Sequence, residues 1–194
     1  VGLAAYVTYH EMPAGADPLG PDNLLGLVNG MLTGSGALFS GRWLATGKSP
    51  LTGGWGDANC GGDLGPAIRQ CGYDGIFFRG VASEPVILYA DGEQVEIRPA
   101  DYLWGQDATV TEETLKAELP GGRRLRVACI GQAGEKRSLI AGICNDRGRL
   151  AGRSGLGAVM GAKRLKAVAL AGNRPATYAD NAEIKRLNKA CAAL

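Results

Sequence analysis

Arginine stands beside glycine in two stretches of the sequence, residues 40–62 and residues 145–161. The first contains Arg42 and ends in Asn-Cys-Gly-Gly at residues 59–62, and the second reads Arg-Gly-Arg-Leu-Ala-Gly-Arg at residues 147–153. Glycine lets successive backbone N–H groups form a concave anion site, and a guanidinium group can donate two parallel hydrogen bonds to a phosphate. The two stretches therefore predict two phosphates, or two copies of one phosphorylated ligand. Composition alone is equally consistent with two solvated surface loops.

Two shorter glycine motifs suggest nucleotide binding, but their spacing argues against it. Residues 155–161 read Gly-Leu-Gly-Ala-Val-Met-Gly, so the third glycine stands one position later than in a dinucleotide loop, and an arginine-rich stretch precedes it instead of a strand. Gly47-Lys48-Ser49 is similar to the end of a P-loop, but Arg42 occupies the place of the first glycine and Pro50 would break the following helix. The P-loop is excluded. A flavin or nicotinamide site at residues 155–161 stays as an alternative to a turn packed closely on a strand.

Cysteine and histidine give little support for a metal site. The chain has five cysteines without a C-x-x-C pair, and its single histidine is His10. We therefore expect no disulfide framework, zinc site or iron–sulfur cluster built from this chain alone, and reduced thiols indicate a cytoplasmic protein. Cys60 stands in a glycine-rich stretch without a neighbouring histidine and is interpreted as inert. Trp43 and Trp55 flank that stretch, where they either wall a flat ligand or pack in the core.

No side chain stands out as a general acid or base. Asp57, Asp63 and Asp146 lie near the arginine–glycine stretches and are interpreted as turn formers or as partners of other side chains. The expected role of this chain is therefore to bind a cofactor and not to transfer protons.

The composition is that of a folded chain with an excess of glycine. The 194 residues include 31 glycines, 45% are hydrophobic, and 21 Lys and Arg against 19 Asp and Glu leave a net charge of +2. This balance excludes disorder and argues against a dedicated nucleic-acid-binding protein. No apolar run has the length of a membrane span. The excess glycine therefore belongs to turns, or to places where the backbone closely approaches another group.

Strands and helices of mixed order must position the two stretches. Apolar runs predict strands at residues 24–28, 43–46, 75–80, 85–90, 94–98, 124–130 and 166–170. Helices are predicted at residues 2–12, 64–71, 111–119, 158–165 and 181–194. Residues 53–62 and 145–157 are predicted as loops, and the apolar run 138–144 is too short to assign. Because these elements do not follow a βαβ order, the predicted fold class is α+β.

A series of motifs runs through the chain in a fixed order. They are Glu11-Met12 with Asp17-Pro18-Leu19, Leu32-Thr33-Gly34, Lys48-Ser49-Pro50-Leu51-Thr52-Gly53, Asn59-Cys60-Gly61-Gly62, Gly72-Tyr73-Asp74, Leu103-Trp104-Gly105, Ile130-Gly131 with Ala133-Gly134-Glu135, Asn145-Asp146, Ala151-Gly152-Arg153, and residues 155–161. In these motifs, residues 2–172 resemble the N-terminal domain of the tungsten-containing aldehyde:ferredoxin oxidoreductases. The resemblance implies two β-sheets with a few helices and glycine-rich loops. On this base would lie two pyranopterins that chelate one tungsten or molybdenum, in an enzyme that oxidises aldehydes to carboxylic acids with ferredoxin as electron acceptor.

The resemblance also implies a set of site residues. The cofactor-binding residues would be Arg42, Asn59, Gly61, Gly62, Arg149, Leu150, Ala151, Gly152 and Arg153. The backbone carbonyls of Asn59 and Leu150 would bind a magnesium ion that bridges the two pterin phosphates, as oxygen ligands suit this cation. Arg42 would lie between one pterin and a 4Fe–4S cluster whose ligands lie outside this chain. Leu150 departs from the alanine common in the family, and Met31 departs from its proline.

The resemblance further implies a division of the chain and a set of partners. Residues 1–174 would form the pterin-binding domain, truncated at its start, and residues 175–194 a linker and the first helix of a helical domain. Its partners would be the missing C-terminal domains, ferredoxin and further copies of the chain, without nucleic acid or membrane, and the isolated chain would be inactive. Two alternatives besides a flavin or nicotinamide site stay open: a non-catalytic scaffold or assembly subunit, and the tungsten subunit of an aromatic acyl-CoA reductase.

Overall fold

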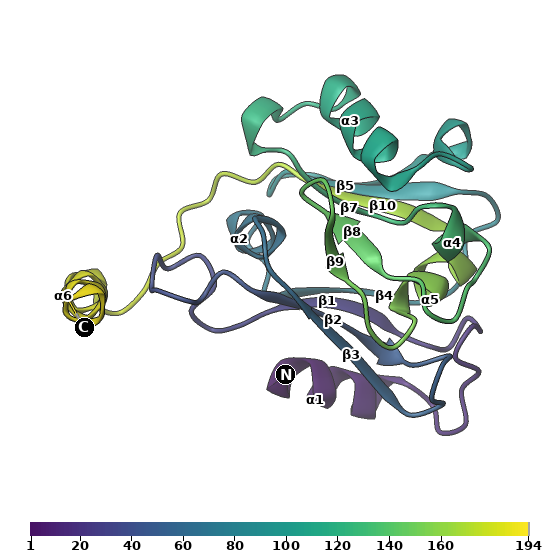
Figure 1. The fold of residues 1–194 in the computed structure, drawn as a ribbon, viewed down its shortest axis with the longest axis horizontal. Coiled ribbons are helices and arrows are strands. Elements are labelled where there is room, and N and C mark those ends of the chain that lie inside the picture. The colour runs from purple at the N-terminus through teal and green to yellow at the C-terminus, as the bar shows by residue number, and fades with distance from the viewer. Residues whose placement is uncertain (194) are drawn as a thin grey trace.

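Two β-sheets form the frame of the protein, whose computed structural model describes residues 1–193 (Figure 1). The first sheet is antiparallel and has the order β3-β2-β1-β4. Its strands are β1 (Leu25–Asn29), β2 (Trp43–Lys48), β3 (Trp55–Cys60) and β4 (Gly75–Phe78). The second sheet has the order β6-β5-β10-β7-β8-β9, in which β5 and β10 run parallel and the other neighbours antiparallel. Its strands are β5 (Val86–Ala90), β6 (Val95–Pro99), β7 (Arg126–Cys129), β8 (Ile143–Asn145), β9 (Arg149–Ala151) and β10 (Leu165–Leu170).

Helices lie between the sheets and on their outer faces. Between the sheets are α2 (Leu64–Gln70) and α5 (Leu156–Ala162), while α1 (Gly2–Glu11) covers the first sheet and α3 (Ala108–Glu118) the second (Figure 1). The short α4 (Gln132–Glu135) packs against α5, and single turns of 3-10 helix form at Asp101–Leu103 and Gly122–Arg124. No helix among residues 1–193 combines the length and apolarity needed to cross a membrane.

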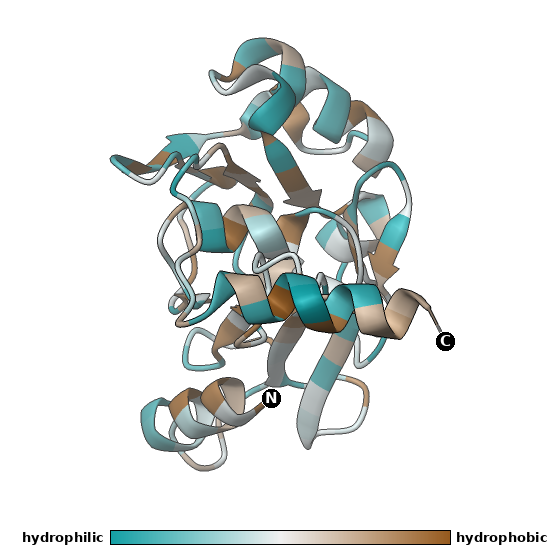
Figure 2. Ribbon diagram, turned by 90° about the vertical axis from the view of Figure 1, so that its left-hand side faces the viewer, coloured by the Kyte–Doolittle hydropathy of each residue, from teal (hydrophilic) through white to brown (hydrophobic). Residues whose placement is uncertain are grey.

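The last helix, α6 (Asn181–Ala192), stands apart from both sheets (Figure 1). None of its residues is buried, and hydrophilic and hydrophobic residues alternate along it (Figure 2). The side chain of Asn188 joins it to the loop before β2, since its oxygen accepts from the Leu38 N–H at 3.0 Å and its amide donates to the Gly36 carbonyl at 2.8 Å. This helix therefore contributes little to the core.

Successive side chains of a strand point to opposite faces of its sheet, so the apolar side chains form three layers. One layer lies between the sheets, one lies under α1 and one lies under α3. In β1, Leu27 faces the central core with α2 and α5, whereas Val28 faces α1. In β10, Val168 faces the central core and Ala169 faces α3. Full burial of a side chain such as Leu27 stabilises the fold by about 1.5–3 kcal/mol. The two sheets are thus held in a fixed relation by one shared core.

Helix α5 approaches neighbouring backbone more closely than any side chain would allow. A Cβ atom at Gly157 would lie 2.4 Å from the Gly142 carbonyl oxygen, and one at Gly161 would lie 1.9 Å from the Gly134 carbonyl oxygen. These glycines serve packing, as the sequence analysis favoured for residues 155–161. At both glycines, carbonyl oxygens of neighbouring backbone fill the space that a side chain would occupy.

The predicted α+β fold class is confirmed, but three local predictions are wrong. Residues 55–60 form β3 and not a loop, because their backbone pairs with β2 along its whole length. Residues 149–151 form β9 and not a loop, because they pair with β8. Helix α3 begins at Ala108 and not at Thr111, because the Asp107 carboxylate caps it by accepting from the Thr109 N–H at 2.7 Å.

Candidate phosphate-binding site

The two arginine–glycine stretches meet where an edge of one sheet lies against an edge of the other. Strand β3 is at the edge of the first sheet, β9 is at the edge of the second, and the two are in contact (Figure 1). The turn after β9 is fastened to the first sheet through Ser154. Its hydroxyl donates to the Asp57 carbonyl at 3.1 Å, and its own carbonyl accepts from the Ser49 hydroxyl at 2.9 Å. The fold therefore brings together two stretches that are far apart in the sequence.

Arg42 and Arg149 converge on Gly61. A Cβ atom at Gly61 would lie 3.5 Å from Arg149 Nη1 and 3.6 Å from Arg42 Nη1. Asn59 orients Arg42, which donates from Nη2 to the Asn59 carbonyl at 3.1 Å and from Nε to the side-chain oxygen of Asn59. Because residue 61 has no side chain, the position between the two guanidinium groups is left to the backbone and to a ligand.

Gly62 permits the close approach of the two stretches. Its φ is +98°, a left-handed conformation that favours glycine. A Cβ atom there would lie 2.1 Å from Asp146 Oδ2 and 2.6 Å from Asn145 Nδ2. Any larger residue would push β3 and the turn after β8 apart.

Three of the arginines at this junction have no acidic partner. Arg126 and Arg147, close by, each pair with a carboxylate at 3.2 Å. Within the described chain no ion pair involves Arg42, Arg149 or Arg153. Unpaired guanidinium groups on an exposed surface are suited to bidentate binding of a phosphate.

The other site residues implied by the resemblance also lie on β9 or in the turn that follows. Ala151 is buried in the central core, whereas Gly152 and Arg153 are exposed. Leu150 is 50% exposed, and its side chain occupies space left by two glycines. A Cβ atom at Gly142 or Gly152 would lie 2.8 Å from a methyl group of Leu150. The side chain at position 150 thus fits where these two glycines have none.

The oxygen atoms that the resemblance assigns to a magnesium ion are two backbone carbonyls. No group of three His, Cys, Asp or Glu side chains able to hold a metal ion occurs in residues 1–193. Asn59 and Leu150 stand on the contacting strands β3 and β9, and both are exposed. The Asn59 carbonyl accepts from Arg42 and keeps a second lone pair for a cation. This donor set suits a hard cation such as Mg²⁺.

Cys60 adjoins the two arginines but stays protonated. It is buried, and its Sγ donates to Asn145 Oδ1 at 3.2 Å. Burial raises the pKa of the Cys60 thiol, although the nearby Arg42 and Arg149 act in the opposite direction. This agrees with the interpretation of Cys60 as inert: the thiol serves as a structural hydrogen-bond donor.

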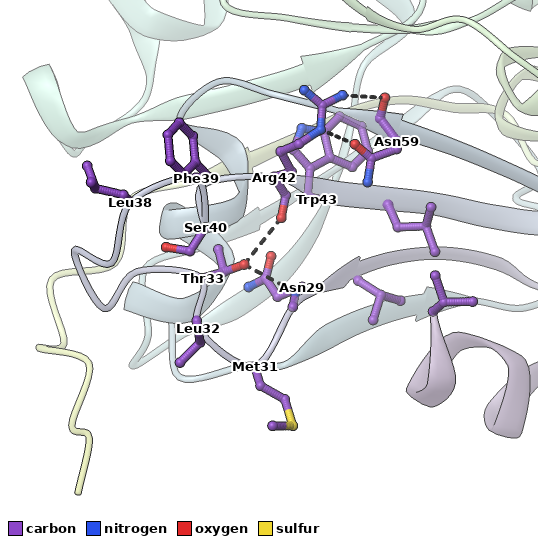
Figure 3. A pocket seen from close by; sticks show the side chains of 14 residues that line it. Asn29, Met31, Leu32, Thr33, Leu38, Phe39, Ser40, Arg42, Trp43 and Asn59 are labelled. Carbon is purple, nitrogen blue, oxygen red and sulfur yellow. Dashed lines mark hydrogen bonds between the residues drawn. The ribbon is translucent and has the colours of Figure 1, made fainter. Parts of the chain in front are cut away.

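A pocket of about 480 Å³ opens beside Arg42 and Asn59 (Figure 3). Trp43 lines this pocket but is 1% exposed and packs in the central core. Trp55 is opposite Lys48, at the other end of the β2–β3 pair from Trp43. The two tryptophans therefore do not wall one ligand together, and core packing is the role of Trp43. Exposed apolar side chains in the loop before β2 also line the pocket: Met31, Leu32, Leu38 and Phe39.

Asn145 is the residue at this junction to which the sequence analysis gave no role. It is fully buried in the second stretch, and its side chain hydrogen-bonds Cys60 and Gly61 of the first stretch. A signal for it was present, since Asn-Asp directly after an apolar run is typical of a turn whose side chains bond to backbone. Its partner at Gly61 lies 84 residues away, so the contact itself was not visible in the sequence.

Comparison with known proteins places this geometry in context. Residues 1–172 match the family described as "Aldehyde ferredoxin oxidoreductase, N-terminal domain". The chain is 44% identical over 179 residues to the tungsten-containing aldehyde ferredoxin oxidoreductase of Pyrococcus furiosus and 45% identical to that of Thermococcus kodakarensis. These matches cover 92% of this chain but 29% of each relative. It is also 34% identical to the WOR-like subunit of an aliphatic sulfonate oxidoreductase from Pyrococcus furiosus, over 90% of this chain and 30% of that protein.

A solved structure shares the fold. The active site complex BamBC of benzoyl coenzyme A reductase, in complex with 1,5-dienoyl-CoA, matches with a TM-score of 0.86 and 40% sequence identity. The match covers 90% of this chain and 26% of that chain. The chain thus spans less than a third of the length of these relatives, and the activities in their names belong to longer polypeptides.

Proposed function

This chain belongs to the aldehyde ferredoxin oxidoreductase family, whose N-terminal domain it matches, and on that premise we propose that it is the base on which a tungsten, or less favourably molybdenum, bis-pyranopterin cofactor lies. The observation that carries the proposal is the convergence of Arg42 and Arg149 on Gly61. Solvated surface loops have no need to direct two unpaired guanidinium groups at one glycine. A pterin phosphate at this position explains both the open space and the unpaired charges.

Each of the two stretches would contribute to the same cofactor. Arg42, which the resemblance also places between one pterin and the 4Fe–4S cluster, would bind the phosphates together with Arg149. The backbone of residues 61–62 and 151–153 would line the phosphates and the pterin edges. The carbonyls of Asn59 and Leu150 would bind the magnesium ion between the phosphates. When bound, the metal centre supplies the exchange of two electrons with the substrate. The residues of this chain hold and orient it, and they move no proton.

The whole protein would oxidise an aldehyde to a carboxylic acid. The reaction takes up one water molecule and releases two electrons and two protons. The electrons would pass through a 4Fe–4S cluster, ligated outside this chain, to ferredoxin. The partners of this domain would be the rest of the polypeptide and further copies of it, in the cytoplasm. The isolated domain would have no activity, because the cluster ligands and substrate-binding residues lie elsewhere.

A second candidate function is the reduction of an aromatic acyl-CoA ester. The observation that favours it is the match to the BamBC complex at 40% identity. The N-terminal domain serves the same cofactor-holding role in either case. Assay of the full-length protein with aldehydes and ferredoxin, and separately with an aromatic acyl-CoA and a low-potential reductant, distinguishes the two.

The test of the proposed function is elemental and pterin analysis of the full-length protein produced with tungstate and molybdate. We expect tungsten or molybdenum with two pterins per metal, and a lower pterin content in Arg42→Ala. Arg79→Ala, an exposed arginine after the opposite edge strand β4, is the matched control and should keep its pterin. A wild-type protein with neither metal nor pterin overturns the proposal and favours the non-catalytic scaffold, whereas an Arg42→Ala variant with full pterin content removes Arg42 from the proposed phosphate site.

A further inference from the structure

A fully buried asparagine joins the two phosphate-binding stretches. Asn145 ends β8, and its side chain has two contacts with the end of β3. The Cys60 thiol donates to Asn145 Oδ1 at 3.2 Å, and Asn145 Nδ2 donates to the Gly61 carbonyl at 3.2 Å. One amide group therefore binds both neighbours in the first stretch.

Asp146, the next residue, adds a second connection between the two stretches. Asp146 Oδ2 accepts from the Asp63 N–H at 2.7 Å and from Asn145 Nδ2 at 2.9 Å. Asp146 thereby binds the backbone just beyond Gly62, on the side of that glycine away from Gly61. Residues 60–63 are held at consecutive points by two adjacent side chains.

The same two residues also fix the second stretch. Asn145 is directly opposite Arg149 in the β8–β9 pair, so the residue whose side chain bonds Gly61 also positions Arg149 through its backbone. Between them the chain turns through left-handed conformations at Asp146 and Arg147, with φ of +47° and +57°. The buried carboxylate of Glu112 supports this turn by accepting from the Arg147 N–H at 2.9 Å. Left-handed residues other than glycine persist where surrounding contacts enforce them.

We propose that Asn145 and Asp146 form a clamp that sets the separation of Arg42 and Arg149 around Gly61, and that they are positioning residues for the two pterin phosphates. The inference rests on the proposed function and deepens it. Neither side chain needs to touch the cofactor, because each acts through the backbone of residues 61–63 and 149. If the clamp is released, β3 and β9 separate and the two guanidinium groups no longer meet at one ligand.

The chain offers a matched control for Asn145. Asn23 is also fully buried, and its side chain also makes three hydrogen bonds: to the carbonyls of Pro18 and Lys48 and from the Lys48 N–H. Lys48 ends β2 at the end opposite to Trp43, and so opposite to the end at which Arg42 and Gly61 lie. Asn145→Ala and Asn23→Ala should therefore lower the melting temperature similarly. A difference between the two variants in cofactor retention then reflects where each asparagine lies and not a difference in stability.

The experiment measures pterin and magnesium retained by the full-length holoenzyme over time after gel filtration, with pterin quantified by fluorescence after oxidation. Loss of a supporting hydrogen bond typically weakens cofactor or metal binding 10- to 100-fold, so Asn145→Ala should release pterin at least about tenfold faster than wild type. Asn23→Ala should stay within about twofold, as expected for a site away from the cofactor.

Substitutions at Asp146 keep the test decisive if Asn145→Ala does not fold. Asp146→Gly tolerates the positive φ and removes the carboxylate, so it should also release pterin faster. Asp146→Asn keeps an oxygen that can accept from the Asp63 N–H and should restore retention to nearly the wild-type rate. Wild-type release rates in Asn145→Ala or Asp146→Gly, or equal acceleration in Asn23→Ala, overturn the clamp. A wild-type holoenzyme without pterin overturns the proposed function, and the clamp with it.

Discussion

Alanine at position 61 tests the phosphate site without disturbing the fold. The new methyl group would lie 3.5 Å from Arg149 Nη1 and 3.6 Å from Arg42 Nη1, which are ordinary contact distances to the ends of flexible side chains. Gly61 is not among the glycines with positive φ, so alanine adopts its conformation without strain. We therefore expect the free energy of unfolding to change by less than about 0.5 kcal/mol.

The same methyl group occupies the space between the two guanidinium groups. A phosphate displaced from one of them loses a charge-assisted hydrogen bond, which contributes about 1.5–3 kcal/mol. This corresponds to a loss of affinity of roughly 10- to 100-fold. Gly61→Ala should therefore give a stable protein that is poor in pterin.

Alanine at position 62, in contrast, should lower the stability of the fold. Its Cβ would lie 2.1 Å from Asp146 Oδ2, and φ is +98°. The left-handed conformation costs about 1–2 kcal/mol and the overlap about 1–3 kcal/mol. At about 2–4 °C per kcal/mol for a domain of this size, the melting temperature should fall by roughly 4–20 °C.

Pterin content per chain and melting temperature, measured on both full-length variants, decide between these outcomes. A Gly61→Ala protein with wild-type stability and full pterin content would refute the placement of a phosphate between Arg42 and Arg149. A Gly62→Ala protein as stable as wild type would refute the packing argument for the junction.

Three further predictions concern the core. Gly161→Ala places a methyl group 1.9 Å from the Gly134 carbonyl oxygen and should cost at least about 3 kcal/mol, so an unchanged urea midpoint would contradict the packing of α5. Glu135→Ala leaves the fully buried ammonium of Lys166 without its carboxylate and should cost about 3–5 kcal/mol in urea denaturation, and a cost below 1 kcal/mol would show that the pair is dispensable. Burial lowers the pKa of Lys163 from 10.5 to about 8. Between these values the native state holds fewer protons at Lys163 than the unfolded state, so its contribution to stability rises with pH. Lys163→Met should remove this rise, and a difference from wild type that is constant between pH 8 and 10.5 would contradict the assignment.

Periodicity located most strands, including the edge strands β4 and β6, but it failed at the edge strands β3 and β9. Strands β1, β2 and β10 were predicted to within two residues, because their apolar side chains pack against helices on both sides. Strands β3 and β9 were predicted as loops, because they are edge strands that combine small, polar and charged residues at the exposed junction. Their pairing depends on partners that the local pattern does not contain. The elements missed in the sequence are therefore those that build the site.

The sequence indicated where the candidate site lies, but not which of its arginines form ion pairs. Arginine beside glycine indicated anion binding in both stretches. Which arginines are free depends on partners far away in the sequence, since Arg126 pairs with Asp63 and Arg147 pairs with Glu113. Residue types alone give Arg147 and Arg149 the same expected role. Only the fold separates the arginine with a carboxylate partner from the one available to a ligand.

The glycines of this chain serve two different purposes. Some allow close packing of backbone, and others would leave space for a ligand. At Gly157 and Gly161 the place of a side chain is filled by backbone oxygens, so no ligand can enter and alanine must disrupt packing. At Gly61 that place is bounded by two cationic side chains, so alanine fits the fold but would compete with the proposed phosphate. Glycines that tolerate alanine in stability but not in cofactor content should therefore mark the surface on which the cofactor lies. Because that criterion uses two independent measurements, it distinguishes a pterin-binding base from a scaffold with the same fold.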